Sequence, residues 1–237
     1  VLNHKKIFAK SIPSYKKAIA LKPDYAEAYN NMGNAFNHQQ KLEEAINAYK
    51  SAISIDPRYA YAYSNMGAAL TDLGDLDQAI KICNKAIILK PDYPYSYYNI
   101  GNAFKDQGMF DQAIEAYNKA ISIQPEYVDP YYNKGICLHG QDKLDESVEA
   151  YDKALSLKPD YYEAYNNKGV SLKDLGKISE AIKNYKKAIL KTIKAGGCNC
   201  SRVNFIGAYY AALKGVRSIP KSWVKKTDAA KRILRQN

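Results

Sequence analysis

Apolar residues recur along most of this chain with the period of an α-helix, in short stretches separated by polar breaks. Between residues 29 and 36 they follow the i, i+3, i+4, i+7 spacing of one helical face. After a polar break at 38–41, a second stripe of this kind runs from 42 to 53. Asp56-Pro57 ends it, because proline cannot continue a helix. The pattern predicts two helices joined by a short turn.

This two-helix pattern repeats every 34 residues. Tyrosine, proline and glycine columns share the period, at Tyr25, Tyr59, Tyr93, Tyr127 and Tyr161, at Pro23, Pro57, Pro91, Pro125 and Pro159, and at Gly33, Gly67, Gly101, Gly135 and Gly169. With Ala26 as position 1, five full units span 26–59, 60–93, 94–127, 128–161 and 162–195. One unit cannot bury its own apolar faces, so the repeat predicts an all-α solenoid.

The glycine column lies in the middle of each first helix, where glycine costs about 1 kcal/mol relative to alanine. A cost that recurs in five units predicts that a neighbouring helix passes close to these positions. Small residues in the second helix predict the same close approach, at Ala52, Ala86, Ala120, Ala154 and Ala188.

The pattern resembles the tetratricopeptide repeat (TPR) family. The third unit carries the family motif at Tyr97, Ile100-Gly101, Phe104, Ala113, Tyr117, Ala120 and Pro125. The resemblance covers about residues 14–195 and implies a right-handed superhelix of antiparallel helix pairs. Residues 1–25 are expected to be a partial repeat with a second helix only, from Ser14 to Leu21, shortened by Pro13.

Five positions depart from the TPR motif. They are Lys134 and Lys168 at position 7, Ser147 at position 20, Cys83 at position 24 and Ile193 at position 32. Because Ile193 stands where proline belongs, the last helix is expected to continue to about Ala195 and to stop at Gly196-Gly197.

In the TPR arrangement the first helices line a concave groove, and position 6, which is Asn in every unit, lies on it. Asn is a poor residue for a helix interior, and we interpret the column as a ladder of amides that bind the backbone of an extended peptide, as in some TPR proteins. The alternative is that these residues only solvate the inner wall. The predicted peptide-binding residues are Asn31, Asn65, Asn99, Asn133, Asn167, Asn34, Asn102, Tyr61, Tyr95, Tyr98, Tyr132, Lys105 and Lys173. For each tyrosine, sideways packing between first helices is an equal alternative.

Charge narrows the choice of ligand. The groove positions lean acidic, through Glu27, Asp72, Asp106, Asp129, Glu163 and Asp174. TPR domains that hold the C-terminal carboxylate of a chaperone need cations at positions 2 and 5, and this chain has none there. Without cations a carboxylate is not bound strongly, so this ligand is argued against.

The composition changes after about residue 190. Residues 191–237 contain 11 Lys and Arg and one Asp, so they hold nearly all of the net charge of +11. No aromatic-basic ladder accompanies these charges, which argues against nucleic acid as the partner. We expect residues 196–237 to form a helical cap on the last repeat, and the alternative is a basic binding arm.

The basic tail also resembles the C-terminal end of the ADP-ribosylglycohydrolase / crystallin J1 family. The resemblance is carried by 195–202, 205–208, Ile219-Pro220 and Trp223. Cys198 and Cys200 stand where that family has two Asp that help to hold a divalent metal, and thiolate is a poor ligand for Mg²⁺. No catalytic residue, metal site or cofactor is therefore predicted.

These observations predict a non-enzymatic interaction module or scaffold. The alternative is a regulatory or degenerate relative of the ADP-ribosylglycohydrolases with TPR targeting repeats. A third reading is self-association through the open end helix that carries Tyr15, Ala18 and Ile19. The chain has no apolar run long enough to span a membrane and no signal peptide, so the four cysteines are expected to be reduced in the cytoplasm.

Overall fold

The computed structural model describes residues 2–194, and the side chains of residues 11–191. Every regular element in residues 2–194 is an α-helix, so the all-α prediction is confirmed for this part of the chain. The helices are α1 (Leu2–Leu21), α2 (Ala26–His38), α3 (Leu42–Ile55), α4 (Ala60–Leu73), α5 (Leu76–Leu89), α6 (Pro94–Asp106), α7 (Phe110–Ile123), α8 (Val128–Gly140), α9 (Leu144–Leu157), α10 (Tyr162–Asp174) and α11 (Ile178–Lys194). The predicted cap, residues 196–237, lies outside the described residues.

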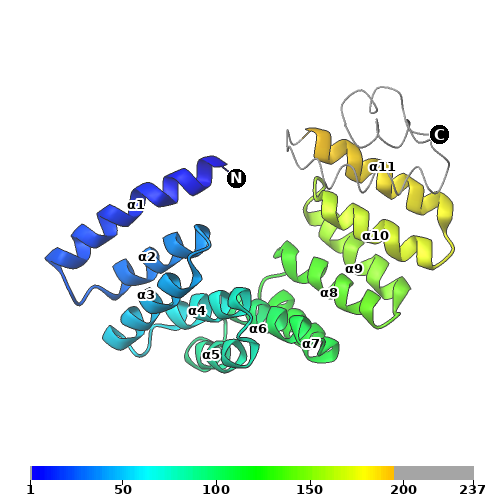
Figure 1. Cartoon of the computed structure of the whole chain (residues 1–237). Helices are drawn as coiled ribbons and strands as arrows, with labels where there is room; N and C mark the ends of the chain where they lie inside the picture. Colours follow the sequence, from blue (N-terminus) through cyan, green and yellow to red (C-terminus); the bar gives the residue numbers. More distant parts are fainter. Residues whose placement is uncertain (1, 195–237) are drawn as a thin grey trace. The chain divides into compact units, whose positions relative to one another are not determined.

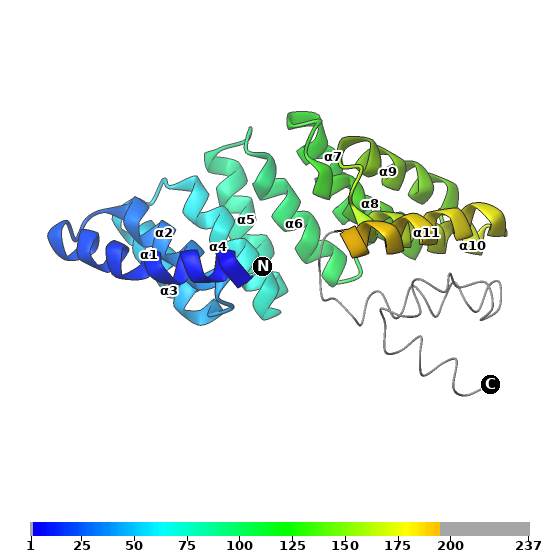
Figure 2. The ribbon, with the colours of Figure 1, turned by 90° about the horizontal axis from the view of Figure 1, so that it is seen from above.

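The chain forms two compact units, Val1–Pro130 and Tyr131–Asn237. In the N-terminal unit, α2 and α3, α4 and α5, and α6 and α7 pack as pairs, and each pair packs on the next (Figures 1 and 2). The first helix α4 also lies beside α2 and α6. These three first helices therefore form one continuous surface, which we call the first-helix face. In the C-terminal unit, α9 packs on α10, and α10 on α11.

The glycine column makes room for a buried side chain of the second helix. A Cβ added to Gly33 would lie 2.5 Å from Cε1 of Tyr49, and one added to Gly101 would lie 2.6 Å from Cε1 of Tyr117. Gly135 and Gly169 have the same relationship to position 24 of their own repeats. The predicted close approach is confirmed, and a tyrosine ring causes it. In the second unit Cys83 takes the place of the ring and contacts the same glycine position.

The turn between the two helices of each repeat has a left-handed residue at position 15. Gly74, Gly108 and Gly176 have φ values of 90°, 77° and 75°, which glycine adopts without strain. Gln40 and Asp142 have φ values of 63° and 59° at the equivalent positions. A side chain with a Cβ is strained in this conformation, although Asp tolerates it better than most residues.

Two departures from the TPR motif find polar partners. The hydroxyl of Ser147 donates a 2.8 Å hydrogen bond to the carbonyl oxygen of Gly135 and lies 3.0 Å from the hydroxyl of Ser171. The ammonium group of Lys168 forms an ion pair with Asp152 on the preceding second helix. Both polar side chains therefore fit the repeat without an unpaired buried group.

The N-terminal helix α1 is longer than the sequence pattern predicted. It begins at Leu2 and continues through Pro13, which was expected to shorten it. An internal proline removes one backbone hydrogen bond, and the helix is maintained on both sides of it. At the other end, α11 continues to Lys194, in line with the absence of proline at position 32. Within the described part of the chain, no helix has the length and apolarity required to cross a membrane.

Candidate functional site

The position-6 asparagines join neighbouring first helices. Nδ2 of Asn65 donates a 3.0 Å hydrogen bond to Oδ1 of Asn30, which lies at position 5 of the preceding repeat. Asn99 donates in the same way to the carbonyl oxygen of Ser64, at 3.0 Å, and to its hydroxyl, at 3.2 Å. Asn65 and Asn99 are thus fixed at equivalent positions of successive repeats on the first-helix face.

The same contact occurs in the C-terminal unit, where Nδ2 of Asn167 donates a 3.0 Å hydrogen bond to the hydroxyl of Tyr132. Asn133 lies half-buried on α8. Asn31 is exposed on α2, and its Oδ1 accepts a 3.4 Å hydrogen bond from Asn30 of the same helix. The sequence did not reveal these partners, because the two residues of each cross-repeat bond are 35 positions apart.

Position 9 is tied to the buried tyrosine column. The hydroxyl of Tyr49 donates a 2.8 Å hydrogen bond to Oδ1 of Asn34, and the hydroxyl of Tyr117 donates one of the same length to Asn102. These bonds satisfy the polar ends of two rings that are almost completely buried. Asn34 and Asn102 are therefore held by the second helices of their own repeats.

The four predicted groove tyrosines divide into two classes. Tyr98 and Tyr132 are half-buried, with ring centroids 6.0 Å from Tyr117 and 5.9 Å from Tyr151, respectively. Each ring packs against the second helix of its own repeat, so this pair has a structural role, although the contact differs from the expected packing between first helices. Tyr61 and Tyr95, at position 2, are 39% and 42% exposed and remain available to a ligand.

The two predicted lysines are paired with acids next to them in sequence. Lys105 forms an ion pair with Asp106, and Nζ of Lys173 lies 2.7 Å from Asp174. The bond from Lys173 lowers the pKa of Asp174, which also contacts His139 at 3.1 Å. Both lysines, which lie near the C-terminal ends of their helices, are therefore already paired with an acid.

Two acids lie near each other at the ends of α4 and α6. Burial raises the pKa of the Asp72 carboxyl above its usual value, and the negative charge of Asp106 raises it further. The charged form of Asp72 therefore destabilises the folded protein at neutral pH.

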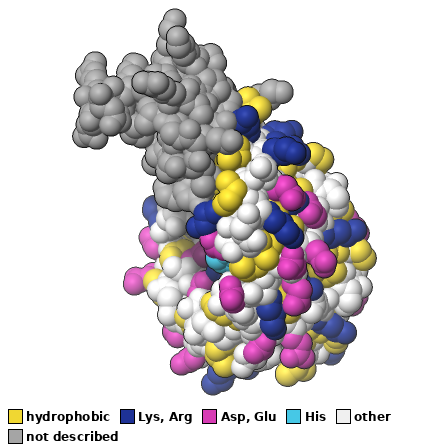
Figure 3. All heavy atoms as spheres, turned by 90° about the vertical axis from the view of Figure 1, so that its right-hand side faces the viewer, with side chains coloured by type: hydrophobic (Ala, Val, Ile, Leu, Met, Phe, Trp, Pro, Cys, Tyr) yellow, Lys and Arg dark blue, Asp and Glu magenta, His cyan; other side chains and the backbone are white. Residues whose placement is uncertain are grey.

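Acidic and basic side chains are interspersed over the face seen in Figure 3.

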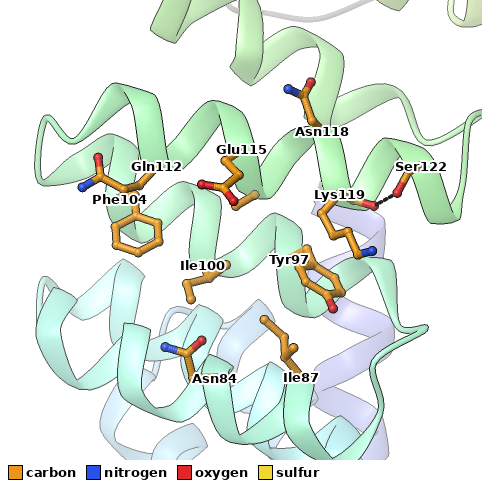
Figure 4. A pocket seen from close by; sticks show the side chains of 11 residues that line it. Asn84, Ile87, Tyr97, Ile100, Phe104, Gln112, Glu115, Asn118, Lys119 and Ser122 are labelled. Carbon is orange, nitrogen blue, oxygen red and sulfur yellow. Dashed lines mark hydrogen bonds between the residues drawn. The ribbon is translucent and has the colours of Figure 1, made fainter.

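A separate groove with a volume of about 760 Å³ lies between α5 and α7 and has α6 as its floor (Figure 4). Ile87, Ile100 and Phe104 supply apolar lining, and Glu115 and Lys119 supply charge. Ser122 also lines the groove, and its hydroxyl donates a 2.8 Å hydrogen bond to the carbonyl oxygen of Lys119 in the same helix. Ser156 makes the equivalent bond in α9. None of the side chains predicted to bind peptide lines this groove.

The fold and the first-helix face define a helical-repeat scaffold, and the chain belongs to the tetratricopeptide repeat family. A family description of the TPR repeat matches residues 8–40, 33–71 and 67–108, and a tetratricopeptide repeat description matches residues 94–127, 128–161 and 162–190. The first of these matches includes most of α1. TPR proteins of this kind are scaffolds for protein interactions.

Solved structures of other TPR proteins share the fold. The crystal structure of MamA is 30% identical in sequence, with a TM-score of 0.62 over 70% of this chain and 96% of that chain. The pilF structure of Pseudomonas aeruginosa has a TM-score of 0.71 at 18% identity and covers 90% of this chain and 97% of its own. YrrB, described as a TPR protein with an unusual peptide-binding site, has a TM-score of 0.57 at 22% identity, over 75% of this chain and 91% of its own.

A shorter similarity links the chain to a second family. Over 43 residues it is 42% identical to Crystallin J1A of Tripedalia cystophora. This segment is 18% of the present chain and only 13% of the crystallin. Cys198, Cys200 and the rest of the predicted crystallin-like tail lie outside the described residues.

Proposed function

We propose that the first-helix face of the N-terminal unit binds an extended segment of a partner protein. The observation that carries the proposal is the register of the position-6 amides. Asn65 and Asn99 are each held by a bond to the preceding first helix, which places equivalent amides at successive repeats. Side chains that are already ordered lose less conformational entropy when a ligand binds.

The chemistry of the amides suits a peptide backbone. An Asn side chain has two N–H hydrogens and two acceptor sites, and a cross-repeat bond uses one hydrogen of Asn65. The remaining sites can donate to a peptide carbonyl and accept from a peptide N–H. Contacts to the peptide backbone do not distinguish one peptide sequence from another. The exposed rings of Tyr61 and Tyr95 are therefore the candidates for selecting peptide side chains.

A displayed library of random peptides tests the proposal directly. We expect the full chain to enrich binders, and we expect Asn31→Ala, Asn65→Ala and Asn99→Ala each to weaken them. Asn31 is the informative variant, because its side chain is exposed and its only described side-chain bond is within its own helix, so the substitution should leave stability unchanged. Asn47→Ala, an exposed position on the second helix α3, is the matched control. If the peptides bind all three variants as tightly as the original chain, the binding site lies elsewhere.

The crystallin similarity favours a second candidate, in which the chain is a regulatory or degenerate relative of the ADP-ribosylglycohydrolases with TPR targeting repeats. Under this candidate the crystallin-like tail would still recruit Mg²⁺. Thermal unfolding with and without millimolar Mg²⁺ separates the two readings. We expect no shift under the scaffold proposal, whereas a rise of several degrees would support the glycohydrolase-related one.

A further inference from the structure

Five tyrosine rings form a continuous row along one edge of the first-helix face. In order they are Tyr59, Tyr61, Tyr93, Tyr95 and Tyr127, with successive centroid distances of 5.9, 4.8, 5.1 and 5.0 Å. The members at position 34 precede the first helices, and those at position 2 lie in the first turns of α4 and α6. We call this set the tyrosine row. Sequence reasoning selected only its position-2 members.

The row alternates between supporting and exposed rings. Tyr59, Tyr93 and Tyr127 are half-buried, and burial raises the pKa of Tyr93 to about 12. Tyr61 and Tyr95 are exposed, and each packs between two of these rings, Tyr61 between Tyr59 and Tyr93 and Tyr95 between Tyr93 and Tyr127. The second and third repeats therefore each present one exposed ring that is held in place by its neighbours.

The two exposed rings lie no farther apart than about one turn of a polyproline II helix. The rings of Tyr61 and Tyr95 are joined through Tyr93 by contacts of 4.8 and 5.1 Å, so their centroids are at most about 10 Å apart. Three residues of polyproline II rise about 9.3 Å. A short polyproline II segment can therefore contact both exposed rings.

The polar groups around the row also suit a proline-rich segment. Proline offers carbonyl acceptors and no N–H donor. The tyrosine hydroxyls can donate, and so can the ammonium group of Lys90, which lies 5.4 Å from the ring centroid of Tyr61. Acids lie near both ends of the row, with Glu27 and Asp56 acting on Tyr59, and Asp129 on Tyr127. These charges disfavour a polyanion such as single-stranded nucleic acid at both ends of the row.

We infer that the tyrosine row binds a proline-rich segment of a partner protein in the polyproline II conformation, with successive turns of the segment on the rings of Tyr61 and Tyr95. Aromatic rows of this kind bind a ligand that is already extended, so little conformational entropy is lost. The inference rests on the proposed function, because it names the class of peptide that the first-helix face selects.

Calorimetry of the full chain with decaproline tests the inference, with a ten-residue Gly-Ser peptide and oligo-dT as comparison ligands. We expect decaproline to bind and both comparison ligands to fail. The double variant Tyr61→Leu/Tyr95→Leu should lose on the order of tenfold in affinity, and Tyr61→Phe/Tyr95→Phe should retain most of it, because the ring supplies the contact. Leu73→Ala, an exposed apolar position at the other end of α4, should change nothing.

Three results overturn the inference. They are absence of decaproline binding, equal binding by the Leu double variant, and preference for oligo-dT. Failure of the inference is distinguishable from failure of the proposed function. If library peptides bind in a manner sensitive to Asn31→Ala but insensitive to the tyrosine variants, the peptide site stands and its proline selectivity does not. Circular dichroism of each variant confirms that the helices are intact.

Discussion

Asn99 joins the first helices α6 and α4 through a single amide, whose Nδ2 lies 3.0 Å from the carbonyl oxygen of Ser64 and 3.2 Å from its hydroxyl. Ser64 is completely buried, so its hydroxyl needs a partner within the protein. The position-6 column therefore has a structural role in addition to any role in binding. This dual role changes what an alanine substitution is expected to do.

Asn99→Ala should lower the free energy of unfolding by about 1 kcal/mol. Two hydrogen bonds worth about 0.5–1.5 kcal/mol each are lost, and the better helix propensity of alanine offsets part of the loss. Asn31→Ala is the matched control and should be neutral or slightly stabilising, because Asn31 is exposed. Urea unfolding followed by circular dichroism measures both. Equal midpoints for the two variants would contradict a structural role for Asn99.

Gly101→Ala should destabilise the N-terminal unit by about 1–3 kcal/mol, because the new Cβ would overlap the ring of Tyr117. The sign should reverse in a Tyr117→Leu background, where the space is open and alanine is the better helix former. A double-mutant cycle from thermal melts gives the coupling between the two positions. Additive effects would show that the ring is not what excludes the methyl group.

Gln40→Gly should stabilise the protein by about 1 kcal/mol. Gln40 has a φ of 63°, a conformation that costs a non-glycine residue about 1–2 kcal/mol, and glycine occupies the equivalent position in three other repeats. Gln39→Gly is the control, because Gln39 has a φ of −88° and gains nothing from glycine. If the two substitutions shift the urea midpoint in the same direction, strain at Gln40 is not the cause.

Asp72→Asn should raise the melting temperature at pH 7 and have little effect at pH 3. The pKa of Asp72 is raised in the folded protein, so its charged form is destabilising above that pKa. As the pH falls, the folded protein takes up the proton first and the penalty disappears. Asp24→Asn, on the exposed turn before α2, is the control. A benefit that is independent of pH would point to a cause other than charge.

Much of the fold follows from the local pattern of the sequence. The 34-residue columns place the helix pairs, the proline stops and the small residues, because helical period and steric size act over a few residues or within one repeat. The pairing of Gly33 with Tyr49 is of this kind, since the two lie 16 residues apart in one unit. The column of asparagines was also visible, and two of its members, Asn65 and Asn99, lie where neighbouring first helices meet.

The tertiary structure decided what each of these side chains contacts. It assigned Asn65 to Asn30 and Tyr98 to Tyr117. It left Tyr61 and Tyr95 exposed, each between two neighbouring tyrosine rings. The sequence could not separate these roles, because Tyr98 and Tyr95 are both plausible groove residues by position. Whether a ring is covered depends on how closely the next repeat packs against it. That distance is set by the stacking of whole helices, which no single repeat contains.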